Sequence, residues 1–417
     1  MKSTVVLYFI VAKEKCLIQT DTREIHLCYN TYMKNYTYRN VTLKEPLSFW
    51  SAFPVADQRF FWFDPIEQNI VMGCEKMETI DEKDISNAPF AFYTQPFFDQ
   101  IKGKTWGSIT KELVTFKHYY TVDLNNKEKN KLYSIALETL PTIVDQEIPE
   151  FHPHLKLLEK DKSEWEHLFQ DIQDALSTQK IEKIVASQRI TLKNLSGHFQ
   201  FEGILKRLMK NNPQAFVFAY QKGDFVFCGA SPEILVKKQG QKIMSYALAG
   251  TMSKGIKNAS QLLLNDSKNR LEHQIVVKSI KEKMLKVSDE VNVSKIETVA
   301  LKNVYHLRTQ LSLIDKKASL IAWAKMLHPT PALGGFPQKD ALHFIKIHEK
   351  HERGLYAAPC GLVKQNGDGT IIVGIRSALF TSEYLYAFAG CGIVSESDCH
   401  SEYEEIKLKL QTILEAL

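Results

Sequence analysis

The stretch AFVFAYQKGDFVFCGASPEILVKK, residues 215–238, contains two runs of aromatic and β-branched residues that meet at Lys222-Gly223-Asp224. Such runs, joined by a short loop with a glycine, are typical of two antiparallel strands. Similar strand-like runs lie near residues 182–190, 370–380 and 385–394. Helical patterns lie between them without regular strand–helix alternation. The sequence therefore predicts an α+β fold built around a mainly antiparallel sheet.

Four segments have the apolar spacing of helices. The clearest begins at Ser163, where Trp165, Leu168, Ile172 and Leu176 recur at helical intervals. The other predicted helices cover residues 202–212, about 261–290, and from near Ser397 to the end of the sequence.

Composition excludes several classes of protein. The 417 residues are 44% hydrophobic, which is enough for a large core, and the net charge of +5 is spread thinly. Because the basic residues form no stripe, we expect no nucleic-acid partner. No apolar run reaches the length of a membrane span, so we expect a soluble protein without a membrane partner.

Cysteine usage and the first residues bear on location in the cell. The seven cysteines show no paired spacing, which is typical of a protein in a reducing cytoplasm. The run STVVLYFIVAKEK, residues 3–15, has a minimal apolar stretch and no clean cleavage site, so we interpret it as a first β-strand. We predict a cytoplasmic protein.

Carboxylates on the last predicted helix have a suggestive spacing. Glu402, Glu405 and Lys409 lie at i, i+3 and i+7 and therefore share one face. Ser397 or Asp398 can cap this helix, and an acidic first turn by itself merely suits the helix dipole. The face also adjoins Ile406 and Leu410, however, and acids that point inward need a cation.

A second carboxylate, Glu272, borders the apolar side of the helix that contains LEHQIVV, residues 271–277. An exposed ion pair is the simplest role for it. Two inward carboxylates from different helices, completed by water, would make a Mg²⁺ site. The pattern HEKHE, residues 348–352, lacks the zinc spacing, and we expect His343, His348 and His351 to lie on an exposed helix face.

Two other features leave alternatives open. Arg376 falls inside the predicted strand of residues 370–380, where a guanidinium needs a carboxylate partner from the protein or a ligand. Lys183 begins a β-branched run and, judged from that alone, is a surface charge, because lysine is almost never fully buried. The glycine pairs in HPTPALGGFP and AGCGIV can bring backbone N–H groups close to an anion, although such loops are often only turns.

Nine blocks of this sequence resemble, in the same order, those of the chorismate-utilising enzymes. This family includes isochorismate, anthranilate, aminodeoxychorismate and salicylate synthases. The resemblance covers residues 165–417, and it implies an α+β fold of large antiparallel sheets packed face to face, with helices outside and a buried active site. Residues 1–150 would be the variable N-terminal part of the fold and residues 151–417 the catalytic core, together one compact unit. The matching blocks are FCGASPEILV, YALAGT, LEHQIVV, HLRTQL, LHPTPALGGFP, ERGLYAAPCGLV, IRSALF, AGCGIVSESD and EYEEIKLKL.

The resemblance also implies roles for individual residues. Lys183 would activate water as a base, and Glu233 would act as the acid that protonates the departing C4 hydroxyl. Mg²⁺ would bind Glu272 and Glu405 with Glu402 close by, and the substrate's enolpyruvyl carboxylate would bind Arg376 and Tyr356. The remaining residues implied in substrate binding are Ala249, Gly250, Thr251, His306, Gly390, Gly392 and Lys409.

Physical chemistry agrees with two of these roles. A carboxyl that donates a proton at neutral pH needs a raised pKa, and the apolar Ile234 and Leu235 beside Glu233 favour one. A lysine in a closed pocket can release its proton and then accept one from water.

Within the family, three features favour the isochorismate synthase branch, an isomerase. Ammonia-using anthranilate synthases have glutamine in place of Lys183, and aminodeoxychorismate synthases have a nucleophilic lysine in place of Ala249. HPTPALGG also resembles the isochorismate-forming branch, whereas Cys360 and the pair Ala357–Ala358 depart from the common pattern. Salicylate synthase, which also eliminates pyruvate, remains an alternative.

The predicted substrate is therefore chorismate and the predicted cofactor Mg²⁺. We expect a monomer that needs no glutamine amidotransferase subunit. The product could enter menaquinone, siderophore or salicylate biosynthesis; menaquinone is our expectation, although no residue distinguishes these pathways.

Overall fold

The computed structural model describes residues 36–53, 58–101, 103, 105–107, 109–135, 142–159 and 162–417. The strand predicted at residues 3–15 lies outside these residues. The helices are α1 (Ser48–Ser51), α2 (Lys162–Ser177), α3 (Phe201–Asn211), α4 (Ala259–Asn265), α5 (Ser267–Leu285), α6 (Leu320–Leu327), α7 (Gln338–His348) and α8 (Cys399–Leu414), with 3₁₀ turns at Glu82–Asn87 and Lys127–Lys129.

Twenty strands of the described residues belong to one hydrogen-bonded sheet, and every pairing is antiparallel. They are β1 (Tyr36–Asn40), β2 (Arg59–Asp64), β3 (Asn69–Thr79), β4 (Phe90–Thr94), β5 (Glu112–Asp123), β6 (Lys131–Ile135), β7 (Leu155–Glu159), β8 (Lys183–Asn194), β9 (Phe216–Lys222), β10 (Phe225–Ser231), β11 (Ile234–Gln239), β12 (Lys242–Ser253), β13 (Asn292–Val293), β14 (Glu297–Ala300), β15 (Val304–Ile314), β16 (Gly335–Phe336), β17 (Pro359–Lys364), β18 (Gly369–Val373), β19 (Ser377–Phe380) and β20 (Tyr384–Ile393).

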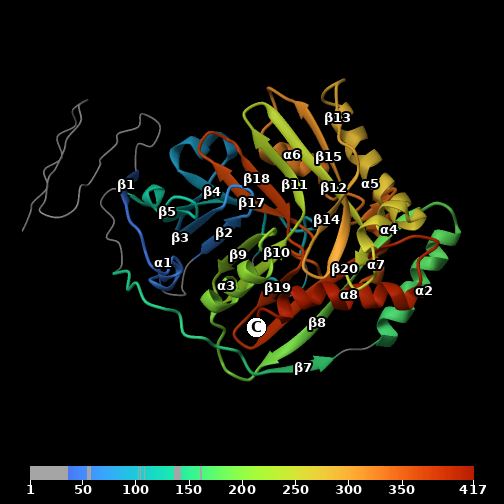
Figure 1. Ribbon diagram of the computed structural model, residues 1–417, viewed down its shortest axis with the longest axis horizontal. Helices are drawn as coiled ribbons and strands as arrows, with labels where there is room; N and C mark the ends of the chain where they lie inside the picture. Colours follow the sequence, from blue (N-terminus) through green and yellow to red (C-terminus); the bar gives the residue numbers. More distant parts are fainter. Residues whose placement is uncertain are drawn as a thin grey trace, which may run out of the picture.

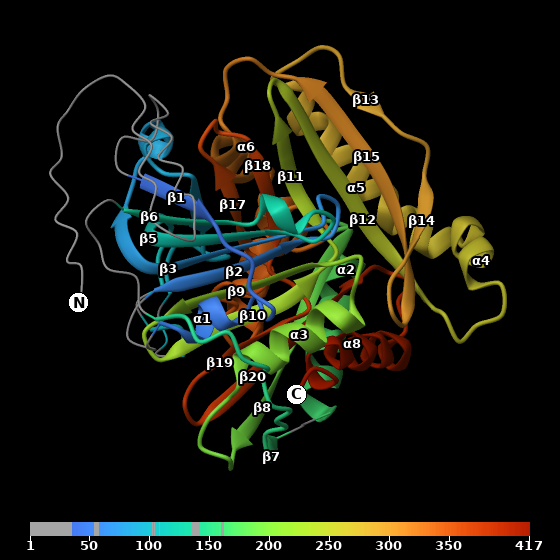
Figure 2. The ribbon, with the colours of Figure 1, turned by 60° about the vertical axis from the view of Figure 1, so that its left-hand side comes forward.

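The order of pairing divides the sheet into two layers that meet at β5. The first layer runs from β5 through β3, β2, β9, β10, β19 and β20 to β8. The second layer runs from β5 through β4, β17, β18, β11 and β12 to β15. Figures 1 and 2 show β8 and β20 toward one end of the molecule and β12 and β15 rising beside them.

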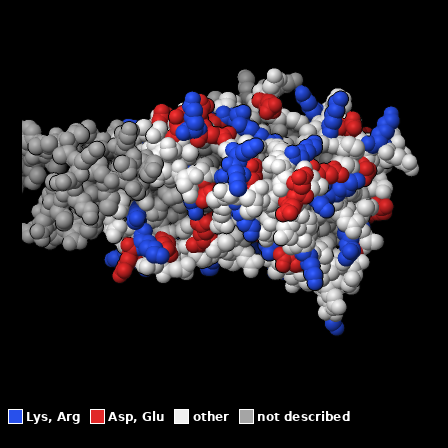
Figure 3. All heavy atoms as spheres, turned by 90° about the horizontal axis from the view of Figure 1, so that it is seen from above, with Lys and Arg blue, Asp and Glu red and all other residues white. Residues whose placement is uncertain are grey.

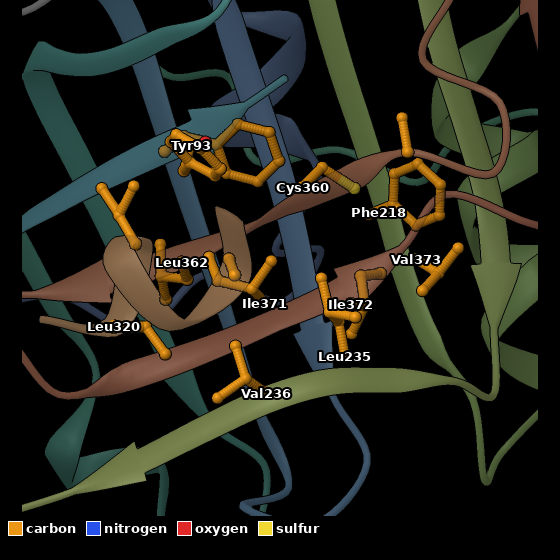
Figure 4. Close-up of a cluster of buried hydrophobic side chains, with 14 of the residues drawn as sticks. Tyr93, Phe218, Leu235, Val236, Leu320, Cys360, Leu362, Ile371, Ile372 and Val373 are labelled. Atoms are coloured by element: carbon orange, nitrogen blue, oxygen red, sulfur yellow. The ribbon is translucent and has the colours of Figure 1, made fainter. Parts of the chain in front are cut away.

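Hydrophobic alternation explains why the layers pack. In β2, Phe60 and Trp62 belong to one core cluster, while Phe61 and Phe63, on the opposite face, belong to the other. The first cluster also contains side chains from β9, β11, β17 and β18, and so fills the space between the layers. Figure 4 shows part of it, where Phe218 of the first layer lies near Val373 of the second. With one face to each core, β2 is buried along its whole length.

Helices cover the outer faces. Side chains of α2, α3 and α8 fill the second core cluster against the first layer, whereas α5 and α6 pack on strands of the second layer. This is the predicted α+β fold of large antiparallel layers with helices outside. Among the described residues, no helix has both the length and the hydrophobicity to span a membrane. On the face in Figure 3, basic and acidic side chains are interspersed.

The chain crosses between the layers at two irregular segments. One, Ser231–Glu233, links β10 of the first layer to β11 of the second. The other, at residues 374–376, links β18 back to β19, and there Arg376 has φ of +52°. The single strand predicted for residues 370–380 was therefore wrong, because this crossing interrupts it. The helix predicted over 261–290 is likewise divided, because Asp266 ends α4 and caps α5 through the amide of Asn269.

Candidate active site

A cavity lies where the two layers and helices α5 and α8 converge. Residues from both layers and both crossings line it: Val185, Pro232, Glu233, Leu248, Ala249, Gly250, Thr251, Glu272, His306, Ala332, Leu333, Arg353, Tyr356, Ala357, Ile375, Arg376, Ala389, Gly390, Cys391, Gly392, Glu405 and Lys409. The predicted site residues Lys183 and Glu402 do not line the cavity. Lys183 instead contacts Glu272, which lines the cavity, and Glu402 lies on α8, the helix of the lining residue Glu405.

Three glutamates at this cavity each contact a lysine. Glu272 on α5 lies 2.9 Å from Lys183, and Glu405 on α8 lies 2.6 Å from Lys409. Glu402 lies 2.5 Å from Lys268 and also accepts a hydrogen bond from Ser397. The helix cap predicted at Ser397 or Asp398 is Asp398, whose carboxylate accepts from the amide of Ser401. This cap begins α8 at the register that brings Glu402 and Glu405 to the cavity side.

Lys183 is fully buried at the start of β8. Its Nζ meets Oε1 of Glu272 at 2.9 Å, but not at a hydrogen-bonding angle, and it makes no hydrogen bond to the described residues. We therefore treat the contact as an ion pair. A buried nitrogen with unused donors favours a polar ligand, because an unpaired polar group is costly in the interior.

The absence of a side chain at Gly392 creates the space that Lys183 and Glu272 occupy. A Cβ at Gly392 would lie 2.4 Å from Oε1 of Glu272 and 2.6 Å from Cε of Lys183. Those distances are far inside van der Waals contact, so any larger residue would displace one of the two side chains. The close approach of a backbone to a functional group is a common reason for glycine in a strand.

Glu233 lies on the crossing from β10 to β11 and is buried. Burial raises its pKa to about 8, against the opposing charges of Lys183, Lys409 and Arg376. Its carboxyl group is therefore largely protonated at neutral pH. The backbone is fixed at this point, since the carbonyl oxygen of Glu233 accepts a hydrogen bond from the amide of Val373.

Arg376 and His306 form a buried pair. Nη2 of Arg376 lies 2.9 Å from Nε2 of His306. A guanidinium can only donate, so Nε2 accepts and the ring proton is on Nδ1, which lies 3.2 Å from the carbonyl oxygen of Gly250. Burial, together with the charges of Arg376 and Lys409, lowers the pKa of His306 to about 3. The neutral ring holds Arg376, whose side chain makes no other hydrogen bond to the described residues.

The other predicted substrate-binding residues surround this pair. Gly250 has φ of +82° at a bulge of β12 that shifts the register between Ala249 and Thr251. Oγ1 of Thr251 lies 3.0 Å from Nδ1 of His306. On the facing wall, Tyr356 stacks on Phe388 of β20 with ring centroids 5.2 Å apart.

Gly390 and Lys409 close the same wall. Nζ of Lys409 donates to the carbonyl oxygen of Gly390 at 2.7 Å. A Cβ at Gly390 would lie 3.0 Å from the hydroxyl oxygen of Tyr356, so glycine admits the phenol to the cavity. All the residues that the resemblance implied thus lie in or directly behind one cavity.

Glu272, Glu402 and Glu405, here called the acidic end of the cavity, fit a hard cation. Its side-chain oxygens all come from carboxylates, which Mg²⁺ binds together with water and substrate oxygens. Burial and the charges of Glu405 and Glu272 keep the pKa of Glu402 raised despite Lys268. Within the described ranges, no three His, Cys, Asp or Glu side chains are already gathered at metal-binding distances. Each glutamate instead contacts a lysine, so the donor set fits the ion but the oxygens would have to converge.

Three features escaped prediction. Lys268 lies four residues before Glu272 on α5, a spacing that could have identified it. Arg353, in the matching block ERGLYAAPCGLV, lines the cavity. The prediction that His351 lies on an exposed helix face was wrong, because it follows α7 and its Nε2 contacts Oγ of Ser187 at 3.0 Å. His343 is exposed on α7 as predicted.

A family model described as chorismate binding enzyme matches residues 111–417. The chain therefore belongs to the chorismate-binding enzymes, as the motif blocks predicted. It is 37% identical over 268 residues to the isochorismate synthase MenF of Bacillus subtilis strain 168, covering 62% of this chain and 56% of that relative. It is 34% identical over 265 residues to the salicylate biosynthesis isochorismate synthase of Pseudomonas aeruginosa, covering 62% and 55%. These alignments span little more than half of each relative.

Solved structures show the same fold. The menaquinone-specific isochorismate synthase MenF from Escherichia coli superposes with a TM-score of 0.77 at 21% identity, over 91% of this chain and 94% of that one. At this identity the likeness concerns the architecture alone. It agrees with the layered antiparallel sheet described above.

Proposed function

We propose that this chain is an isochorismate synthase, which converts chorismate to isochorismate by adding water at C2 and removing the hydroxyl group at C4. Three things support the proposal: membership of the chorismate-binding enzymes, likeness to two isochorismate synthases, and the arrangement of Lys183 and Glu233. The observation that carries it is chemical. A buried amine, ion-paired with Glu272 but making no hydrogen bond to the described residues, lies directly behind the cavity, and a buried carboxyl group with a pKa of about 8 lines it.

The substrate is a dianion, and the cavity has a place for each carboxylate. Arg376, buried and held by His306, would bind the enolpyruvyl carboxylate together with the phenol of Tyr356. Glu272, Glu402 and Glu405 would hold Mg²⁺, which would neutralise the ring carboxylate and the charge that develops on it. The ring then lies between the acidic end and Glu233.

Lys183 would take a proton from water as its oxygen bonds to C2, and the ring double bonds shift. The C4–O bond breaks, and Glu233 would donate its proton so that the leaving group departs as water. One water enters and one leaves, so the reaction is an isomerisation. The enzyme returns to its starting state once the proton gained by Lys183 has been restored to Glu233 through solvent.

Incubation of the purified protein with chorismate and Mg²⁺ tests the proposal. We expect isochorismate to form, as followed by chromatography, and to disappear as a product when a chelator removes the metal. Unchanged chorismate would refute the proposal. Formation of an aminated product when ammonia is supplied would instead assign the chain to the amine-transferring branch, although Lys183 and Ala249 argue against that result.

The same incubation separates salicylate synthase, because that reaction also releases pyruvate. We expect no stoichiometric pyruvate, as measured with lactate dehydrogenase and NADH. We also expect full activity without an added glutamine amidotransferase and a single-chain mass in solution. The pathway that consumes the product, for which menaquinone biosynthesis is our expectation, can be tested by deleting the coding sequence and measuring quinone and siderophore levels.

A further inference from the structure

The strand that carries Lys183 has a gap along one edge. On one side β8 pairs with β20 from Ile184 to Lys193. On the other side it pairs with β16 only at Lys183 and Ile184, and with β7 only from Thr191 onward. Backbone groups between these two pairings have no strand beside them in the described part of the chain.

A buried ion pair occupies this gap. The Glu349 side chain is 3% exposed and that of Arg353 1% exposed. Oε1 of Glu349 accepts from the amide of Ser187 at 2.9 Å, and Nη2 of Arg353 donates to the carbonyl oxygen of Val185 at 2.8 Å. These are the acceptor and donor that a neighbouring strand would otherwise provide. The two side chains therefore continue the ladder just after Lys183.

The same pair reaches a second segment that lines the cavity. Nη1 of Arg353 donates to the carbonyl oxygen of Leu333 at 2.7 Å, and Leu333 lines the cavity. Nε of Arg353 donates to Oε2 of Glu349 at 2.8 Å, so the guanidinium serves several acceptors at fixed angles. Its backbone carbonyl also accepts from the amide of Tyr356 at 2.7 Å. Arg353 thus connects the Lys183 strand and the Leu333 loop through its side chain, and the Tyr356 turn through its backbone carbonyl.

We propose that the Glu349–Arg353 ion pair is a positioning unit for the reaction, which sets the place of Lys183 relative to the Leu333 wall and Tyr356. This inference rests on the proposed function, because it assigns Lys183 to the chemical step. Neither Glu349 nor Arg353 acts on the substrate's bonds; the pair acts through the backbone of β8. A small displacement of a reacting group is enough to reduce turnover strongly.

Arg353→Lys tests the proposal, because lysine keeps the charge beside Glu349 but cannot serve three acceptors at fixed angles. We expect kcat to fall about 100-fold while KM for chorismate changes less than about threefold. Glu349→Gln keeps an acceptor for the amide of Ser187, and we expect a smaller fall in kcat of about tenfold. Hydrogen exchange of the peptide containing residues 184–190 should quicken in both variants.

Arg59→Lys is the matched control. Arg59 is also buried and bonds Gln221 and the carbonyl oxygen of Trp50, but it does not line the cavity. This variant should melt at a lower temperature with an unchanged kcat per folded molecule. Wild-type kcat in both Arg353→Lys and Glu349→Gln would overturn the inference, as would an equal loss in Arg59→Lys. If Arg353→Lys does not fold, Glu349→Gln decides. A wild-type protein that leaves chorismate unchanged would refute the proposed function instead.

Discussion

Glu405 and Glu233 are carboxyl groups at opposite parts of one buried cavity, and they differ in charge. Burial alone would raise the pKa of Glu405, but Lys409 at 2.6 Å, with the charge of Lys268, holds it below the usual value. Glu233 has positive groups nearby but contacts none of them, and burial raises its pKa to about 8. At Glu405 the lysine in direct contact thus outweighs burial, whereas at Glu402 burial and two neighbouring carboxylates outweigh Lys268, and at Glu233 no cation is in contact.

This difference divides the cavity by chemistry. The part formed by α5 and α8 has three carboxyl groups suited to a cation, among them Glu405 with its lowered pKa, and the crossing between β10 and β11 has a carboxyl group that can donate a proton. The same residue type therefore has two protonation tendencies, each set by its surroundings, and these suit the two roles proposed above. The following predictions test that division.

A substitution that deprives residue 233 of its acidic proton should have the largest effect on kcat. Glu233→Gln keeps the size of the side chain but cannot release a proton, and we expect kcat to fall about 1000-fold. Steady-state formation of isochorismate measures this. Glu112→Gln, which changes a buried carboxylate on β5 outside the cavity, should leave kcat per folded molecule unchanged. A Glu233→Gln variant with near wild-type turnover would remove Glu233 from the mechanism.

At the acidic part, Glu405→Gln should weaken Mg²⁺ binding by about tenfold to 100-fold, because a charged oxygen ligand becomes a neutral one. Titration calorimetry in the presence of chorismate measures the affinity. Glu404→Gln is the control, since Glu404 is on the same helix but pairs with Lys407 at the surface. Equal affinities in the two variants would contradict the assignment of Glu405 to the metal.

Gly392→Ala tests the contact between the two parts of the site. Its Cβ would displace Glu272 or Lys183, and we expect kcat to fall about 30-fold with the fold retained. Gly255→Ala is the matched control, because its Cβ would meet only Oγ of Ser253 at 3.5 Å. If both variants have the kcat of the wild type, the space beside Gly392 is not required for turnover.

A change in pH should have the smallest effect of the four tests, measured as the change in kcat/KM per pH unit. In the proposed mechanism Glu233 acts in its protonated form, so kcat/KM should fall as the pH rises through about 8, by up to about tenfold per unit. The folded pKa lies above the unfolded value, and the free energy of unfolding should therefore also decrease as the pH rises from 4.5 through about 8. Denaturant titrations measure this decrease, which Glu233→Gln should lack. A flat profile to pH 10 would contradict the raised pKa.

Local pattern and motif order predicted much of the fold and the site. The spacing of Glu402, Glu405 and Lys409 placed them on one face of α8, since helical geometry fixes that relation. The resemblance to the family, rather than any local pattern, identified Lys183, because its burial depends on β20 and α5 packing against β8.

What escaped prediction depended on distant contacts. Arg376 lies at a crossing between layers, and a β-branched run gives no sign that it will bend there. Arg353 was missed because its partners at Val185 and Leu333 belong to segments that are remote in sequence. His351 was misplaced for the same reason, since the contact with Ser187 forms only in the folded chain.

The dependence of the cavity on α8 has a consequence for synthesis of the protein. Every other described element precedes this helix, yet it carries Glu402, Glu405 and Lys409. A nascent polypeptide that has emerged only as far as β20 already holds the amine and the proton donor but no complete cation site. If the proposed function holds, such a chain on the ribosome should be unable to consume chorismate until α8 has docked.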